Sequence, residues 1–189
     1  MPKAIVKELE HSILTLPQKE KDRLLLRLIS QKPILIEQLH YKLLEDPVLD
    51  LEERFQQAKA DISTLIFISK GQKEKAMLQN IRKANATITH HKRITSDKIG
   101  EVRLAVFLVD CVLETNKLVF VEGNFSFYYE KAYTYILKKV WAILKLIEKL
   151  HEDYFIEFES DLNRILHNIN NGLMAPLAKQ LSIPKEFSF

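Results

Sequence analysis

The stretch that most constrains the fold is residues 126–171, which contains neither Pro nor Gly. Apolar side chains recur along it three or four positions apart, the spacing that puts them on one face of an α-helix. The series consists of Tyr128, Ala132, Ile136, Val140, Ile143, Ile147, Leu150, Tyr154, Phe158, Leu162, Ile165 and Ile169. It predicts one very long helix, or two with a break near residues 151–155. We favour the break, with Ser160 as a candidate cap for the restart.

The same periodicity predicts helices over the rest of the chain. We expect them at residues 3–15, from Pro17, from Pro33, at 51–68, at 72–91, from Ser96 and at 176–181. Two of these carry leucine-rich stripes, at Leu24, Leu25, Leu28 and Ile29 and at Ile36, Leu39, Leu43 and Leu44. Residues 104–113 are apolar on almost every side, which is typical of a central, buried helix. Residues 117–125 interrupt the helical period and could form a short extended piece.

The predicted fold class is all-α. We expect an irregular helical bundle, or a short array of antiparallel helical hairpins, with seven to eight helices in a single domain over residues 1–189. Only four glycines are present, well separated along the chain. This excludes the glycine-dense phosphate loops of nucleotide-binding enzymes and the G-x-S-x-G elbow of hydrolases.

Cysteine usage and hydropathy favour a cytoplasmic protein without membrane insertion. The single cysteine, Cys111, cannot form an internal disulfide or a multi-cysteine zinc site. The N-terminus leads into a charged amphipathic segment, without the apolar core of a signal peptide. The most apolar run, residues 104–113, is far shorter than the ~20 residues that span a bilayer.

Three stretches carry a family resemblance. They are LPQKEKDRLLLRLISQKP at residues 16–33, LLEDPVLDLEERFQQAKADI at 43–62, and VFLVDCVLETN with FYYEKAYTYILKKVWAIL within 106–144. In order and spacing they resemble a group of small uncharacterised all-helical bacterial proteins of unknown function. The resemblance implies a bacterial, cytoplasmic, all-helical protein, and it supplies no functional residues.

Positive charge is concentrated in residues 70–103, which hold nine Lys or Arg and three Asp or Glu. The candidate partner surface here comprises Lys73, Lys75, Arg82, Lys83, Lys92 and Arg93. Such cations could contact nucleic-acid phosphates or an acidic protein. The stretch contains no Phe, Tyr or Trp on which single-stranded bases could stack. A solvated helix face is the simpler interpretation.

Aromatic residues are dense between positions 125 and 141. The seven are Phe125, Phe127, Tyr128, Tyr129, Tyr133, Tyr135 and Trp141. They exceed what one helix face can bury, so we expect most in the core and some at an oligomer or partner interface. Tyr128, Tyr129, Tyr133 and Trp141 join the candidate partner surface, because Tyr and Trp are enriched at interfaces.

The sharpest polar pattern is Glu-x-x-His, which occurs at Glu8/His11, Glu37/His40 and Glu148/His151. Two such pairs with two further glutamates, such as Glu114 and Glu130, could form a ferritin-like di-metal site. Ordinary surface pairs between residues three positions apart are the favoured explanation of the pattern. Asp110, within the most apolar helix, is a candidate acid or base, and Cys111 reads as a small buried apolar residue. We predict no catalytic residue, metal or cofactor.

The sequence therefore favours a non-enzymatic protein–protein interaction or scaffold module, with a protein partner or a second copy of the chain. The first alternative is nucleic-acid binding through residues 70–103. The second is a metal-dependent enzyme with Glu-x-x-His ligands.

Overall fold

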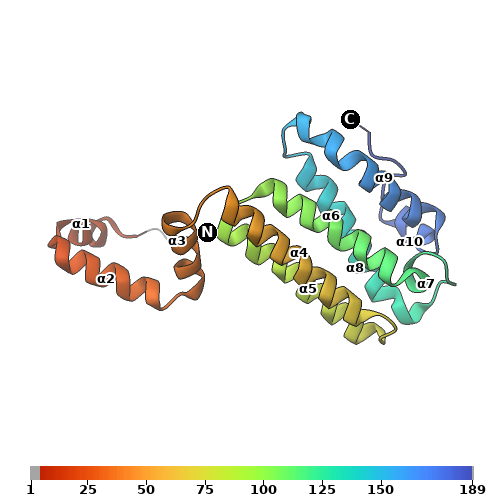
Figure 1. Ribbon diagram of the computed structural model, residues 1–189, viewed down its shortest axis with the longest axis horizontal. Coiled ribbons are helices and arrows are strands. Elements are labelled where there is room, and N and C mark those ends of the chain that lie inside the picture. Colours follow the sequence, from red (N-terminus) through yellow and green to blue (C-terminus); the bar gives the residue numbers. More distant parts are fainter. Residues whose placement is uncertain (1–4, 189) are drawn as a thin grey trace. The chain divides into compact units, whose positions relative to one another are not determined.

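A computed structural model of the chain describes residues 5–188, and within them it contains ten α-helices and no β-strand. The all-α prediction is confirmed (Figure 1). Eight of the ten helices are nine residues or longer, and the other two are single short segments. The helices group into two compact units, of which the first ends at Glu45 and the second begins at Asp46. Whether both units unfold together is a thermodynamic question, so the single-domain expectation stays a prediction.

The first unit contains α1 (Lys7–Thr15), α2 (Gln18–Ser30) and α3 (Pro33–Leu44). Prolines mark its boundaries as expected: Pro17 precedes α2 and Pro33 is the first residue of α3. After α3, Glu45 turns to an extended conformation ahead of the Asp46-Pro47 pair. The α2 and α3 helices contact each other.

The second unit is built around α6 (Lys98–Thr115). It packs against α4 (Leu49–Ser69), α5 (Glu74–Thr95), α8 (Glu130–Ile147) and α9 (Phe155–Asn171), and α10 (Ala175–Gln180) packs on α9 (Figure 1). Nine residues of α6 are buried, including Leu104, Leu108 and Val109. The prediction of a central, buried helix is confirmed.

Three local expectations need correction. Residues 117–125 contain a helical turn, α7 (Lys117–Phe120), instead of an extended piece, because it buries Phe120 fully in the core. The predicted break after α8 is present, but α9 begins at Phe155 and Ser160 lies inside it. Ser96 ends α5 in a left-handed conformation (φ 60°), and Asp97 caps α6 in its place.

The predicted core faces are buried in the second unit, apart from the exposed Tyr128 and Tyr154, and are not buried in the first. The apolar stripes of α8 and α9 are buried from Ala132 to Ile147 and from Phe158 to Ile169. In the first unit, by contrast, none of the described residues is buried. The leucine-rich stripes of α2 and α3 are formed as helix faces, yet three short helices supply too few neighbours to cover them.

Candidate interaction surfaces

The first unit exposes an unusual amount of apolar side chain. Each of eleven Val, Ile or Leu residues is between 38% and 75% exposed. This set, called the N-terminal apolar surface below, comprises Ile5, Val6, Leu9, Leu14, Leu25, Leu26, Leu28, Leu35, Ile36, Leu43 and Leu44. Scattered exposed leucines are ordinary, but a concentration of this density in one small unit makes these residues a candidate interaction surface.

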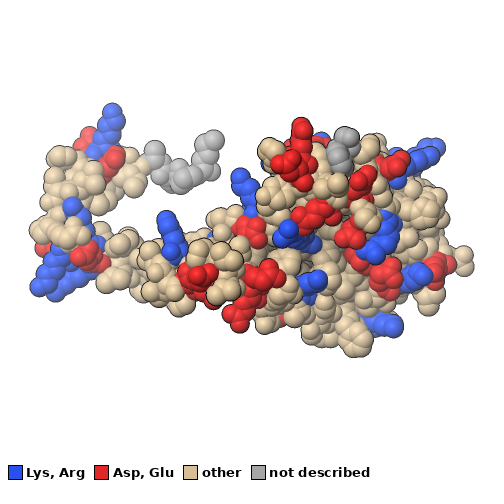
Figure 2. Space-filling model, turned by 45° about the horizontal axis from the view of Figure 1, so that its top comes forward, with Lys and Arg blue, Asp and Glu red and all other residues tan. Residues whose placement is uncertain are grey.

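Two polar contacts of the first unit do not cover this surface. The amide of Gln18 donates to Asp22 one turn later at 2.8 Å, and His40 Nδ1 lies 2.8 Å from Glu45 Oε1. Both contacts connect residues near in sequence. On the face drawn in Figure 2, charges of both signs in this unit lie between broad areas of uncharged side chains.

The basic stretch gains neighbours from α8 that the sequence did not predict. The Arg82 guanidinium on α5 lies 5.7 Å from the ring centre of Tyr135 on α8, a cation–π distance. Lys131, Thr134 and Lys138 of α8 line the same shallow pocket. This combination, called the α5–α8 basic surface, supplies the aromatic ring that residues 70–103 lack. Glu130 also lines the pocket and offsets part of its positive charge.

Not every cation of the stretch is available. Lys92 is paired with Glu101 of α6, and Arg103 is paired through two nitrogens with Glu157 of α9. The hydrogen bonds that the Arg103 guanidinium donates to the Glu157 carboxylate raise the pKa of Arg103. Lys73, Lys75 and Lys83 are exposed, as are Arg82 and Arg93. Most of the predicted cations therefore lie on the surface, whereas Lys92 is paired at the junction between α5 and α6.

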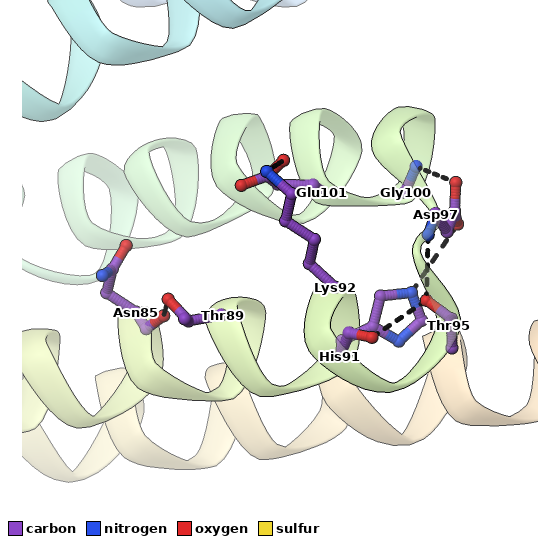
Figure 3. Close-up of polar contacts among 8 residues, drawn as sticks. All are labelled: Asn85, Thr89, His91, Lys92, Thr95, Asp97, Gly100 and Glu101. Atoms are coloured by element: carbon purple, nitrogen blue, oxygen red, sulfur yellow. Dashed lines mark hydrogen bonds and ion pairs between the residues drawn. The ribbon is translucent and has the colours of Figure 1, made fainter. Parts of the chain in front are cut away.

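That junction is a compact polar network between α5 and α6 (Figure 3). The Asp97 carboxylate accepts a hydrogen bond from the Gly100 amide at 2.8 Å and lies 3.6 Å from Nε2 of the buried His91. The nearby His91 ring lowers the pKa of Asp97 despite partial burial, and the hydrogen bond from the Gly100 amide lowers it further. Thr95 accepts from the Asp97 amide at 3.1 Å and donates to the His91 carbonyl at 2.9 Å. The network holds the chain reversal between α5 and α6, and it leaves Nε2 of His91 without a hydrogen-bond partner among the described residues.

The aromatic residues divide between core and surface. Tyr133 lies in the interior, 1% exposed, in edge contact with Phe120 at 5.7 Å between ring centres. It is therefore unsuited to a partner surface, because α8 directs it inward beside Ala132 and Ile136. Tyr129 is half-buried, whereas Tyr128 and Trp141 remain exposed. Lys145 lies 4.8 Å from the ring centre of Trp141.

The candidate metal ligands lie on different elements, and the candidate acid Asp110 is paired with Arg164. Within residues 5–188, no group of three or more His, Cys, Asp or Glu is arranged to hold a metal ion. The Glu-x-x-His pairs lie on α1, on α3 and after the end of α8. Burial raises the pKa of Asp110, which forms a 3.0 Å ion pair with Arg164. Burial likewise raises the pKa of Cys111, which keeps its thiol protonated at neutral pH.

No helix of the described chain is both long and apolar enough to cross a bilayer. Comparisons with protein-family models, with curated proteins and with solved structures find no match for this chain.

Proposed function

We propose that the protein is a non-enzymatic, helical protein–protein interaction module whose contact face is the N-terminal apolar surface. One observation carries this proposal: eleven large apolar side chains are exposed in a unit that buries none of its described residues. Leaving such area in water costs free energy, and covering it with a partner recovers about 25 cal/mol per Å². The second unit supplies the stable core to which this contact element is attached.

Two further features support a binding role in the cytoplasm. One buried polar pair of the second unit joins two helices: Asn116 donates to Ser69 across the α4–α6 contact at 3.1 Å. The single thiol suits a reducing compartment, since no disulfide within the chain can form. The resemblance to bacterial helical proteins fits the same location.

Site-specific photo-crosslinking in living cells tests the contact face. A photoreactive amino acid replaces Leu25 in the N-terminal apolar surface, and a matched variant carries it at Leu118, which is 76% exposed in α7. We expect discrete protein adducts from position 25 and none from position 118. Absence of adducts at position 25, or equal adduct yields at both positions, would contradict the assignment.

A second candidate function, nucleic-acid binding, is favoured by the α5–α8 basic surface. Arg82, Lys131 and Lys138 could contact phosphates, and Tyr135 could stack on a base or remain under Arg82. Binding of single-stranded and duplex oligonucleotides at two salt concentrations tests this. The expected result is affinity that falls with salt and falls further in Arg82→Glu/Lys138→Glu, with Lys185→Glu as the control. Salt-independent binding, or none at low salt, rejects this second function.

A further inference from the structure

We infer that the partner covering the N-terminal apolar surface is a second copy of this chain. This inference rests on the proposed function and makes its partner specific. In the pair, the α1–α3 unit of one copy packs on the α1–α3 unit of the other copy. The six helices together form a shared core. The missing burial, the exposed apolar area and the balanced charge of this unit each favour a second copy.

The α1–α3 unit is too small to bury its own apolar faces. Chains near or below about 40 residues usually need a disulfide, a metal or oligomerisation to be stable. The chain has a single cysteine, in the other unit, and the α1–α3 residues hold no metal-binding cluster. Oligomerisation remains, and pairing of two-helix elements such as α2–α3 is a standard route to a bundle.

The exposed apolar area of the α1–α3 unit is large enough for a stable pair. Fully burying a Val, Leu or Ile recovers about 1.5–3 kcal/mol at about 25 cal/mol per Å², so one side chain carries roughly 60–120 Å². With exposures of 38–75%, the eleven side chains offer roughly 400–800 Å² of apolar area per copy. A standard interface buries about 800 Å² per partner, of which a little over half is apolar. The two areas agree.

The small net charge of the α1–α3 unit also favours a second copy. A two-fold symmetric contact places one patch against the same patch, so a strongly charged surface repels itself. Residues 1–45 hold eight Lys or Arg and six Asp or Glu, a net charge of only +2. Both signs alternate on α2, in Lys19-Glu20-Lys21-Asp22-Arg23. Such a surface tolerates its own copy, and it lacks the excess charge that would select a highly acidic or basic partner.

Sedimentation equilibrium of the full chain over a wide concentration range tests the inference. We expect a dimer for the natural sequence and for Leu118→Glu, a control exposed in the second unit. Leu25→Glu/Leu43→Glu should associate at least tenfold more weakly, because two buried carboxylates per copy would face an apolar contact. Far-UV circular dichroism checks that the variants keep their helices.

A measurement without variants keeps the test decisive if the double variant loses helix. Amide hydrogen exchange of the natural protein at high and low concentration should reveal added protection in α1–α3 at high concentration and unchanged protection in α6. A dimer that persists in Leu25→Glu/Leu43→Glu with its helices intact, or assembly into open-ended oligomers, would overturn the symmetric pair.

A monomer at every concentration would also overturn it, and hydrogen exchange then separates the two failures. Slow exchange in α1–α3 of that monomer means that the chain covers its own apolar surface, and the proposed function fails too. Fast exchange there means that the surface stays open to a different protein, so only the second copy is rejected.

Discussion

At the scale of single residues, the α5–α6 junction concentrates two functions in Asp97. Its carboxylate caps α6 through the Gly100 amide and approaches the buried His91 ring (Figure 3). This geometry favours glycine at position 100, since an added Cβ would displace the Asp97 carboxylate and crowd Nε2 of His91. The effects of substitutions at Gly100 and Asp97 are therefore coupled.

This coupling predicts a non-additive pair of substitutions. Asp97→Ala should lower the free energy of unfolding by about 1 kcal/mol through loss of the cap. Gly100→Ala should bring little or no gain in the natural protein, because displacing Asp97 offsets the better helix propensity of Ala. In the Asp97→Ala background the collision is gone, so Gly100→Ala should stabilise by up to about 1 kcal/mol. Urea unfolding of the four proteins measures this, and strict additivity would contradict it.

Two carboxylates should give opposite dependences on pH. The folded-state pKa of Asp97 is lowered by the nearby His91 ring and by the Gly100 amide, so its stabilisation is present above the unfolded pKa and is lost as pH falls through the lower folded value. The pKa of Asp110 is raised by desolvation, so its contribution is fully present below the unfolded pKa and is lost as pH rises through the higher folded value.

The stability deficit of Asp97→Asn relative to the natural protein should therefore shrink on acidification below the ordinary aspartate range. The stability of Asp110→Asn relative to the natural protein should instead be highest at neutral pH. At that pH the natural protein must bury an ionised carboxylate, and the variant has none to bury. Denaturant unfolding at pH 7 and near pH 3 measures both differences. Parallel pH trends for the two variants would show that the assigned causes are wrong.

At the scale of helices, periodicity predicted position and inward face wherever a neighbour existed. Met77, Ile81 and Ile88 of α5 and the long series of α8 and α9 are buried as their spacing indicates. Cap identity was less predictable, because Ser96 and Asp97 are both good capping residues and only the backbone decides between them. The packing of α8 beside α5, which brings Tyr135 under Arg82, joins residues far apart in sequence and follows from tertiary packing alone.

Core and surface leucines on these helices should differ sharply in cost. Leu108 of α6 is fully buried, so Leu108→Ala should lower the free energy of unfolding by about 2–5 kcal/mol through lost contacts and a cavity. Leu118→Ala, at 76% exposure, should stay within about 0.5 kcal/mol of the natural protein. Chemical denaturation compares them, and similar costs at both positions would contradict α6 as the central helix.

At the scale of the whole molecule, the sequence predicted the class of fold, but it did not predict that the apolar faces of α1–α3 stay exposed. An amphipathic stripe such as Leu25, Leu28 and Ile29 indicates which face of a helix avoids water. It carries no information on whether that face is covered by the same chain or by another molecule. The stripes of α2 and α8 look alike in sequence, yet only α8 has a buried face.

This unequal burial predicts unequal stability along the chain. Amide hydrogens exchange through local opening wherever few apolar contacts must be broken, and only through global unfolding in the core. At the lowest workable protein concentration, amides of α1–α3 should exchange orders of magnitude faster than those of α6, whose nine buried residues anchor the second unit. Mass spectrometry of exchange in peptides from α2 and α6 measures the ratio. Equal protection would mean that both units unfold in one cooperative step, as a single domain requires, with the N-terminal apolar surface covered within the chain.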